Sequence, residues 1–234
     1  MPVYNEGENV VPTLMGIKSA VTTEPYEVLV VYDFEEDTTV PVVRGLAAEL
    51  PQVRLHKNDL GRGALNAIKS GLAAAAAPYI VVTMADASDE PADIDRMQAL
   101  AERGADVVCG SRYMRGGHHV GGPWLKKLMS RAAGLSLHWV GGLPVHDATN
   151  SFRLYSRRLL DQVTIESSGG FELGIELTVK AHQLGLKVAE VPTTWRDRTG
   201  GESRFQMRAW IPHYAHWYWR GLASRLRRRS ARLI

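Results

Sequence analysis

Short apolar runs alternate with helix-like stretches through the first half of the chain, and this alternation limits the possible folds more than any other feature. The strand-like runs are EVLVVYD (27–33), QVRLHK (52–57), YIVVTM (79–84) and ADVVCG (105–110). The helix-like stretches lie at 7–21, 38–50, 62–77 and 91–103. Nearly continuous apolar strands joined by helices indicate strands covered on both faces. The sequence therefore predicts an α/β fold with a mostly parallel central sheet flanked by helices.

The second half of the chain has fewer strand signals. It is predicted to hold a helix at 123–139, the run FRLYS, a helix at 171–184 and the strand KVAEVPTTW. A length of 234 residues suits one large domain. We expect that domain at 1–204, with halves at 1–110 and 111–204, and a terminal helix at 205–234. The opening PVYNE resembles a loop that leaves a strand, so we expect that the first, central strand is missing.

Composition excludes several classes of protein. The single cysteine, Cys109, excludes an internal disulfide framework and suits a reducing compartment. The longest apolar stretch, GLAAAAAPYIVVTMA, is mostly alanine and is interrupted by Pro78. Such a stretch is a poor bilayer span, so no transmembrane segment is expected.

Acidic residues gather in three loops that are expected at the same edge of the sheet. They are Glu6, the run Asp33–Asp37, and Asp86 with Asp89. Ligands of open α/β sheets bind outside the carboxyl ends of the strands, where these loops meet. Clustered carboxylates repel one another unless water or a cation neutralises them. They could also be helix caps, as Asp89 before Glu90-Pro91 suggests. A nucleoside diphosphate with a divalent ion would explain all three clusters.

Six motifs carry a resemblance to a known family. They are, in order, PVYNE, VVYDFEEDTT, MADASDEPADI, GSRYMRGG, DATNSFRLYS and DRTGGESRF. In this order the chain resembles the family-two glycosyltransferases with the GT-A fold, and within them the polyprenyl-phosphate, or dolichyl-phosphate mannose synthase-like, branch. The resemblance implies inverting transfer of a hexose (mannose or glucose type) from a GDP- or UDP-sugar to a polyprenyl phosphate, with Mg²⁺ or Mn²⁺.

The resemblance also assigns roles on the donor side. The nucleotide contacts it implies are Pro2, Tyr4, Glu6 and Asp33, the last of which reads the base. Asp86 matches the final aspartate of the D-x-D metal motif, and Ser88 and Asp89 are further candidate ligands. Two departures stand out, because Met84 replaces the first aspartate of that motif and Tyr32 replaces an acid beside Asp33. Metal binding should therefore depend on Asp86, Asp89 and the diphosphate.

Basic residues are implied on the acceptor and leaving-group sides. Arg112, Lys126 and Ser130 match acceptor-phosphate contacts. Arg198 and Arg204 match a basic pair that acts with Asp86 in catalysis. Negative charge grows on the departing diphosphate, and arginine offers it a planar fork of donors.

Two alternatives remain open from the residues. If the acceptor is a hydroxyl, a general base is required, and Asp147 or Glu176 becomes the candidate, although Glu176 could equally be a structural partner. Met84 and the missing strand also suit a catalytically silent nucleotide-binding or scaffold protein.

Two glycine-rich stretches have different predicted roles. The first is expected to begin a packed helix, and the second to cover the site. GRGALNAIKSG (61–71) lacks the lysine-serine ending of a P-loop, so helix packing is expected there. RGGHHVGG, with His118 and His119, is interpreted as a flap over the acceptor side.

The C-terminal segment is basic and aromatic. From Gly201 onward it has eight arginines and one acid, Glu202. Aromatic residues recur at helical spacing, at Trp210, Tyr214, Trp217 and Tyr218. This pattern is typical of a helix on an anionic membrane, and it also fits a helix packed on the body or on a membrane partner subunit. No nucleic-acid-binding module is recognisable. We expect a peripheral protein at the cytoplasmic membrane face.

Overall fold

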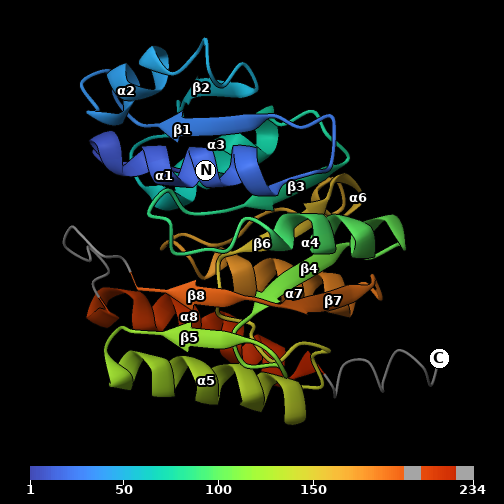
Figure 1. The fold of residues 1–234 in the computed structure, drawn as a ribbon. Coiled ribbons are helices and arrows are strands. Elements are labelled where there is room, and N and C mark those ends of the chain that lie inside the picture. Colours follow the sequence, from blue (N-terminus) through green and yellow to red (C-terminus); the bar gives the residue numbers. More distant parts are fainter. Residues whose placement is uncertain (198–206, 225–234) are drawn as a thin grey trace.

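The computed structural model of the chain describes residues 1–197 and 207–224 (Figure 1). The helices are η1 Gly7–Asn9 (a 3-10 turn), α1 Val10–Ala20, α2 Thr39–Gly45, α3 Ala64–Ala74, α4 Asp93–Glu102, α5 Trp124–Trp139, α6 Arg157–Leu160, α7 Leu173–Gln183 and α8 Met207–Leu222. The strands are β1 Val28–Tyr32, β2 Val53–Lys57, β3 Tyr79–Val82, β4 Val107–Ser111, β5 His118–Val120, β6 Arg153–Ser156, β7 Val188–Pro192 and β8 Thr194–Arg196. The predicted alternation is confirmed.

The strands form three paired groups. β1 pairs with β2 in parallel, β5 pairs with β8 in parallel, and the largest group has the order β3-β6-β4-β7. In that group β4 and β7 are parallel, while β6 runs antiparallel to both of its neighbours. β3 and β4 therefore point the same way, and the loops that follow them leave the same edge of the sheet.

Apolar residues on successive positions of β1 contact opposite layers, which explains the continuous run. Val30 belongs to the buried cluster that includes Leu14 of α1. Val31 lies beside Gly71 of α3, where a side chain larger than hydrogen would meet its methyl group. Side chains alternate across a strand, so a strand covered on both faces needs apolar residues at every position.

Met1–Val3 run beside β1. Val3 donates its backbone N–H to the Val31 carbonyl at 2.9 Å, and Val31 donates to the Met1 carbonyl at 2.8 Å. A cavity of about 600 Å³ lies between β1 and β3, and Pro2, Leu29 and Ile80 are among the residues that line it. No pairing between β1 and β3 occurs in the described part of the chain.

The stretch GRGALNAIKSG opens α3. Leu65, Ile68 and Leu72 of this helix are buried in the main core, as the packing interpretation predicted. Gly63 has φ +126°, a conformation that favours glycine, and its backbone N–H points away from the helix to Asp33.

The stretch RGGHHVGG is not the loop expected of a flap. Its central residues form β5, which pairs with β8. Gly117 lies so close to the backbone of Ser111 that a Cβ would collide with it. Glycine at this position lets the chain fold back tightly and enter a short strand, which the sequence did not reveal because Val120 is its one apolar residue.

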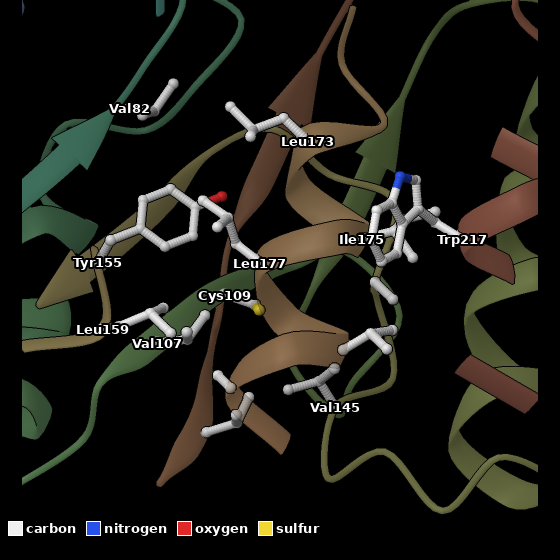
Figure 2. Close-up of a cluster of buried hydrophobic side chains, with 14 of the residues drawn as sticks. Val82, Val107, Cys109, Val145, Tyr155, Leu159, Leu173, Ile175, Leu177 and Trp217 are labelled. Carbon is white, nitrogen blue, oxygen red and sulfur yellow. The ribbon is translucent and has the colours of Figure 1, made fainter. Parts of the chain in front are cut away.

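The C-terminal helix α8 packs on the body of the protein. Trp217 is only 2% exposed and lies in the core beside Ile175 of α7 (Figure 2). Tyr218 shares a hydrogen bond of 2.9 Å with Ser136 of α5. Of the interpretations that the sequence left open for this helix, packing on the body is the one seen. None of the helices described here is both long and apolar enough to cross a bilayer.

Candidate active site

Asp33 is held in place at the carboxyl end of β1. Its carboxylate accepts hydrogen bonds from the Asn58 side chain at 2.7 Å and from the Gly63 backbone at 2.8 Å. These donors follow β2 and precede α3, so three segments fix the position of one carboxylate. Such a fixed acceptor suits recognition of a polar ligand edge.

The loop after β1 is tied to the loop that contains Tyr4 and Glu6. The fully buried Asp37 accepts from the Asn5 backbone at 3.0 Å and from the Thr39 backbone at 2.8 Å. The Glu6 backbone donates to the Thr39 hydroxyl at 3.0 Å, and the Tyr4 ring contacts the Phe34 ring edge-to-face. The predicted donor-binding residues of these two loops are therefore neighbours.

The acidic run after β1 is not a cation site of its own. Asp37 serves the loop hydrogen bonds, and Glu35 forms ion pairs with Lys57 at 3.0 Å and with Arg44 at 3.4 Å. Asp33, by contrast, is held by Asn58 and Gly63 at the carboxyl end of β1. The prediction that all three acidic clusters serve a bound diphosphate was too broad, because basic neighbours and backbone donors already neutralise most of the second one.

Asp86, Ser88 and Asp89 follow β3 in one tight turn. Asp86 accepts from the Ser88 backbone at 3.2 Å. Asp89 is 8% exposed and accepts from the Thr83 hydroxyl at 2.9 Å and the Met84 backbone at 3.0 Å. Burial, with a smaller contribution from the Asp86 charge, raises the pKa of Asp89 to about 6 despite these two donors. This turn therefore holds carboxylate charge that its own hydrogen bonds do not fully stabilise.

Arg112 follows β4 and forms the most extensive polar cluster of the site. Its Nε donates to Asp147 at 2.7 Å and its Nη2 donates to the other Asp147 oxygen at 3.0 Å. The same Nη2 contacts the hydroxyls of Ser130 at 3.0 Å and Thr149 at 2.9 Å. Tyr113 adds a hydrogen bond of 2.7 Å to Ser130. We define these five residues as the Arg112 cluster.

Electrostatics fix the charge states within the Arg112 cluster. Asp147 is fully buried, which alone would raise its pKa, but the Arg112 guanidinium outweighs burial and holds the pKa of Asp147 below its usual value. The Arg112 side chain is itself only 9% exposed. Asp147 is therefore a permanent counter-ion and is unsuited to act as a general base.

The Arg112 cluster and the β3 turn are close enough to influence each other. The Arg112 charge lowers the pKa of Asp89, against the larger effect of burial, and the Asp89 charge contributes to the raised pKa of Arg112. The structure thus brings Asp86, Asp89, Arg112 and Ser130 of the predicted residues to one edge of the sheet. Lys126 lies one helical turn before Ser130 on α5, on the same face.

Glu176 is a structural residue. It is fully buried in α7 and accepts from the Glu166 and Ser167 backbones at 2.6 and 2.7 Å and from Lys180 at 2.7 Å. The interpretation of Glu176 as a base is wrong, because its carboxylate oxygens hold a loop and a lysine inside the core. Arg198 and Arg204 lie outside the described residues.

Three polar residues of the acceptor side, Tyr113, Lys127 and Thr149, were missed from the sequence, and His119 was placed there only as part of a flap. Tyr113 and Thr149 belong to the Arg112 cluster, and His119 of β5 shares a hydrogen bond of 3.3 Å with Tyr113. Lys127 donates to the His119 carbonyl at 2.9 Å. Burial, followed by the charges of Arg112 and Lys127, lowers the pKa of His119 to about 4. Tyr113 follows Arg112 directly, and Thr149 lies two residues after Asp147. This closeness to predicted residues is the one sequence feature that could have indicated them.

The candidate metal ligands are few. In residues 1–197 and 207–224 no group of three or more histidines, cysteines and carboxylates could hold a metal ion. Asp86 and Asp89 would supply two hard oxygen ligands, which Mg²⁺ and Mn²⁺ prefer, and a bound diphosphate would have to supply others. These two carboxylates therefore suit a divalent cation that binds together with the diphosphate.

Carboxylates after β3 and a buried arginine after β4 lie at one edge of an α/β sheet, an arrangement that suits a phosphorylated ligand with a divalent ion. The family model "Glycosyl transferase family 2" matches residues 1–164. The chain belongs to glycosyl transferase family 2, and it is a glycosyltransferase.

Similar proteins agree with this family. The chain is 31% identical over 238 residues to polyprenol monophosphomannose synthase of Mycolicibacterium smegmatis, covering 97% of this chain and 88% of that protein. It is 33% identical over 241 residues to undecaprenyl-phosphate mannosyltransferase of Micrococcus luteus, covering 97% of both. Glucosyl-3-phosphoglycerate synthase of Mycobacterium tuberculosis, crystallised with Mn²⁺, UDP-glucose and phosphoglyceric acid, is 19% identical. The match covers 93% of this chain and 77% of that one with a TM-score of 0.68, which confirms the predicted GT-A fold.

Proposed function

We propose that this glycosyltransferase moves a hexose, most simply mannose, from a nucleoside diphosphate sugar to a polyprenyl phosphate. The names of the two relatives with more than 30% identity support both the sugar and the acceptor. The Arg112 cluster is the observation in this chain that carries the proposal.

The Arg112 cluster suits a phosphate acceptor. Its guanidinium is oriented by Asp147, and the hydroxyls of Ser130 and Thr149 surround Nη2, so arginine and hydroxyl donors converge. Arginine binds phosphate oxygens through its planar fork of N–H groups. Lys126 and Lys127 of α5 add positive charge on the same side.

A phosphate acceptor also removes the need for a base. A phosphate oxygen is already an anion, so it attacks the anomeric carbon directly while the bond from that carbon to the diphosphate breaks. The diphosphate leaves with the electron pair, and attack from the opposite side inverts the configuration. Both bases considered for a hydroxyl acceptor are occupied, Asp147 by Arg112 and Glu176 by Lys180 and backbone N–H groups.

The donor side is assigned to the first half of the chain. Pro2, Tyr4, Glu6 and Asp33 would hold the nucleoside, with Asp33 reading the base from its fixed position. Asp86, Asp89 and Ser88 would hold Mg²⁺ or Mn²⁺, which when bound neutralises charge on the diphosphate. The Mn²⁺ in the glucosyl-3-phosphoglycerate synthase complex supports a divalent ion. Arg198 and Arg204 complete the proposal as partners of the leaving diphosphate.

A test separates the acceptor classes directly. Purified protein is incubated with GDP-mannose or UDP-glucose, with Mn²⁺, Mg²⁺ or EDTA, and with either a short polyprenyl phosphate or the polyprenol of equal chain length. We expect nucleotide release and a glycosylated product only with the phosphate and a divalent ion. Transfer to the polyprenol would favour a hydroxyl acceptor, and no turnover with any donor would favour a silent nucleotide-binding protein.

A further inference from the structure

Glu190 is a nearly buried carboxylate that makes its hydrogen bonds to His146, outside the Arg112 cluster. It lies on β7, and its side chain is 9% exposed. One of its oxygens accepts from the His146 backbone N–H at 2.8 Å, and the other lies 2.5 Å from Nδ1 of the His146 ring. Burying a carboxylate costs free energy unless its partners compensate, and here both of its oxygens hold a single loop residue.

The loop before Asp147 is held on several sides. The His146 ring stacks on the ring of His138 at a centroid distance of 4.0 Å, and His138 donates from Nδ1 to the Leu143 carbonyl at 2.8 Å. Gly134 of α5 leaves room for the His146 carbonyl, because a Cβ at this position would collide with that oxygen. The backbone N–H, the ring and the carbonyl of His146 are therefore all fixed, and so is the peptide that leads into Asp147.

Asp147 passes this orientation on to Arg112. Its carboxylate accepts from the Arg112 backbone N–H at 3.1 Å, from Nε at 2.7 Å and from Nη2 at 3.0 Å. Its carbonyl oxygen accepts from the buried Arg153 at 3.3 Å. The chain is thus anchored on both sides of Asp147, by Glu190 through His146 on one side and by Arg153 on the other. The carboxylate between these anchors directs the guanidinium of Arg112.

The central sheet closes this chain of contacts. β7 pairs in parallel with β4, with Glu190 opposite Cys109, and β4 ends directly before Arg112 (Figure 1). Glu190 and Arg112 therefore come from neighbouring strands of one sheet, and the loop that contains Asp147 bridges them. Glu190 keeps this loop in register with β4, so that Asp147 meets Arg112 at a fixed distance.

We infer that Glu190 is a positioning residue for the acceptor phosphate. Through His146 it fixes Asp147, and through Asp147 it orients the Arg112 guanidinium. The inference rests on the proposed function, which places the acceptor phosphate at Arg112. Binding of a phosphate by parallel N–H groups depends on their direction, so a loosened guanidinium should bind the acceptor less tightly while the donor side is unaffected.

Steady-state kinetics with each substrate varied in turn test the inference. Glu190→Leu has a similar size but no oxygens, and its KM for a water-soluble short-chain polyprenyl phosphate should rise roughly tenfold, as for one lost charged hydrogen bond. Its KM for the sugar nucleotide should stay the same. Glu190→Gln should restore the acceptor KM, because its amide oxygen accepts from the backbone N–H and its NH₂ group donates to Nδ1 of the other His146 tautomer.

An equal rise in both KM values of Glu190→Leu, or no rise in either, would overturn the inference. Circular dichroism checks that the variant folds. If it does not fold, His146→Phe replaces it, since phenylalanine keeps the ring stack and the backbone N–H but loses the Nδ1 contact. The same acceptor-selective rise is then expected, and its absence would overturn the inference.

Asp95→Ala is the matched control. Asp95 of α4 also holds a loop, and it accepts from the backbone N–H groups of Thr22 and Thr23 at 2.9 and 3.0 Å. That loop precedes β1, whereas Asp33 of the site follows β1, so the control loosens a loop at the other end of the strand. It should melt at a lower temperature and leave both KM values unchanged. An acceptor-selective rise in this variant would overturn the inference, because any loss of stability would then have the same effect.

A double-mutant cycle tests the route through Arg112. If Glu190→Leu and Arg112→Lys act independently, together they should raise the acceptor KM about a hundredfold. If Glu190 acts through the Arg112 guanidinium, the double variant should stay close to the roughly tenfold rise of Arg112→Lys alone. An additive result would overturn the inference.

A spectroscopic measurement separates this inference from the proposed function. In protein isotope-labelled at the arginine nitrogens, the Nε–H signal of Arg112 is identified by its absence in Arg112→Lys, and it reports the contact with Asp147 without any substrate. Its exchange with water should be about tenfold faster in Glu190→Leu and unchanged in Glu190→Gln. Faster exchange in a protein whose wild type transfers to no acceptor would refute the proposed function and support the orientation of Arg112 by Glu190. Unchanged exchange in Glu190→Leu would refute the positioning role alone.

Discussion

Two buried carboxylates on either side of the site differ in their charge balance. Asp147, on the acceptor side, is fully buried and has a lowered pKa because Arg112 contacts both of its oxygens. Asp89, on the donor side, is nearly as buried, yet burial raises its pKa to about 6. Its partners are one hydroxyl and one backbone N–H, which carry no charge.

The difference shows how the two halves of the site are prepared for their ligands. The acceptor side contains its own counter-ion, so the Arg112 guanidinium is held in position before any phosphate arrives. On the donor side, burial raises the pKa of Asp89, and a divalent ion with a diphosphate would favour its charged form. One half is therefore preorganised by the protein, and the other is completed by what it binds.

Asp147→Ala should produce the largest effect on stability. It leaves the Arg112 charge buried without its carboxylate, and breaking a buried ion pair on one side costs about 3–5 kcal/mol. Urea denaturation measures the loss. Glu35→Ala, which breaks exposed ion pairs to Lys57 and Arg44, is the control and should leave the midpoint nearly unchanged. If both variants shift the midpoint equally, the acceptor side is not organised around Asp147.

Asp86→Ala should produce the next largest effect, on catalysis. Removing a group that stabilises charge on the leaving diphosphate lowers kcat by about 10²–10³-fold, equivalent to roughly 3–4 kcal/mol. Initial rates with a polyprenyl phosphate acceptor measure it, and a thermal melt checks that the fold is retained. Asp161→Ala removes an exposed carboxylate after α6 and should keep wild-type rates. Retained activity in Asp86→Ala would remove this residue from the metal site.

Sequence patterns predicted the helices and main strands because buried segments must be apolar, whatever they pack against. The patterns could not predict pairing. FRLYS gave no sign that β6 would enter the sheet antiparallel to β3 and β4. β5 has a weak apolar signal, since Val120 is its one apolar residue and the strand is defined by its pairing with β8.

For the candidate site, the sequence predicted which residues lie together better than it predicted what each residue does. Arg112 and Ser130 were predicted to act together, and they do contact each other. Asp147 was considered as a base because the role of a carboxylate in a motif depends on the side chain that contacts it. Its partner Arg112 lies 35 residues earlier in the chain, so the sequence did not reveal the contact.

The pH dependence of stability should be opposite on the two sides. The pKa of Asp89 is raised from 3.8 to about 6, so the folded state binds a proton that the unfolded state releases. Stability from Asp89 is then lost as pH rises from about 4 to about 6. Asp89→Asn cannot ionise and should be more stable than the wild type above that range by up to about 3 kcal/mol.

Denaturation in EDTA at about pH 4 and pH 8 measures this difference, which should be near zero at the lower pH. Adding Mn²⁺ with a nucleoside diphosphate at pH 8 should reverse the order, because the wild type then gains a ligand that Asp89→Asn binds less tightly. An Asp89→Asn advantage that is the same at both pH values would mean that burial does not perturb this carboxylate.

Arg112→Lys should produce the smallest effect and should be confined to the acceptor. Lysine keeps the charge beside Asp147 but loses the fork that also reaches Ser130 and Thr149. Losing one charged hydrogen bond to a phosphate costs about 1.5 kcal/mol, so KM for the polyprenyl phosphate should rise roughly tenfold. KM for the sugar nucleotide should stay the same, because the donor side is built from other segments. Steady-state kinetics with each substrate varied in turn would show this split, and an equal rise in both KM values would mean that Arg112 binds the donor diphosphate instead.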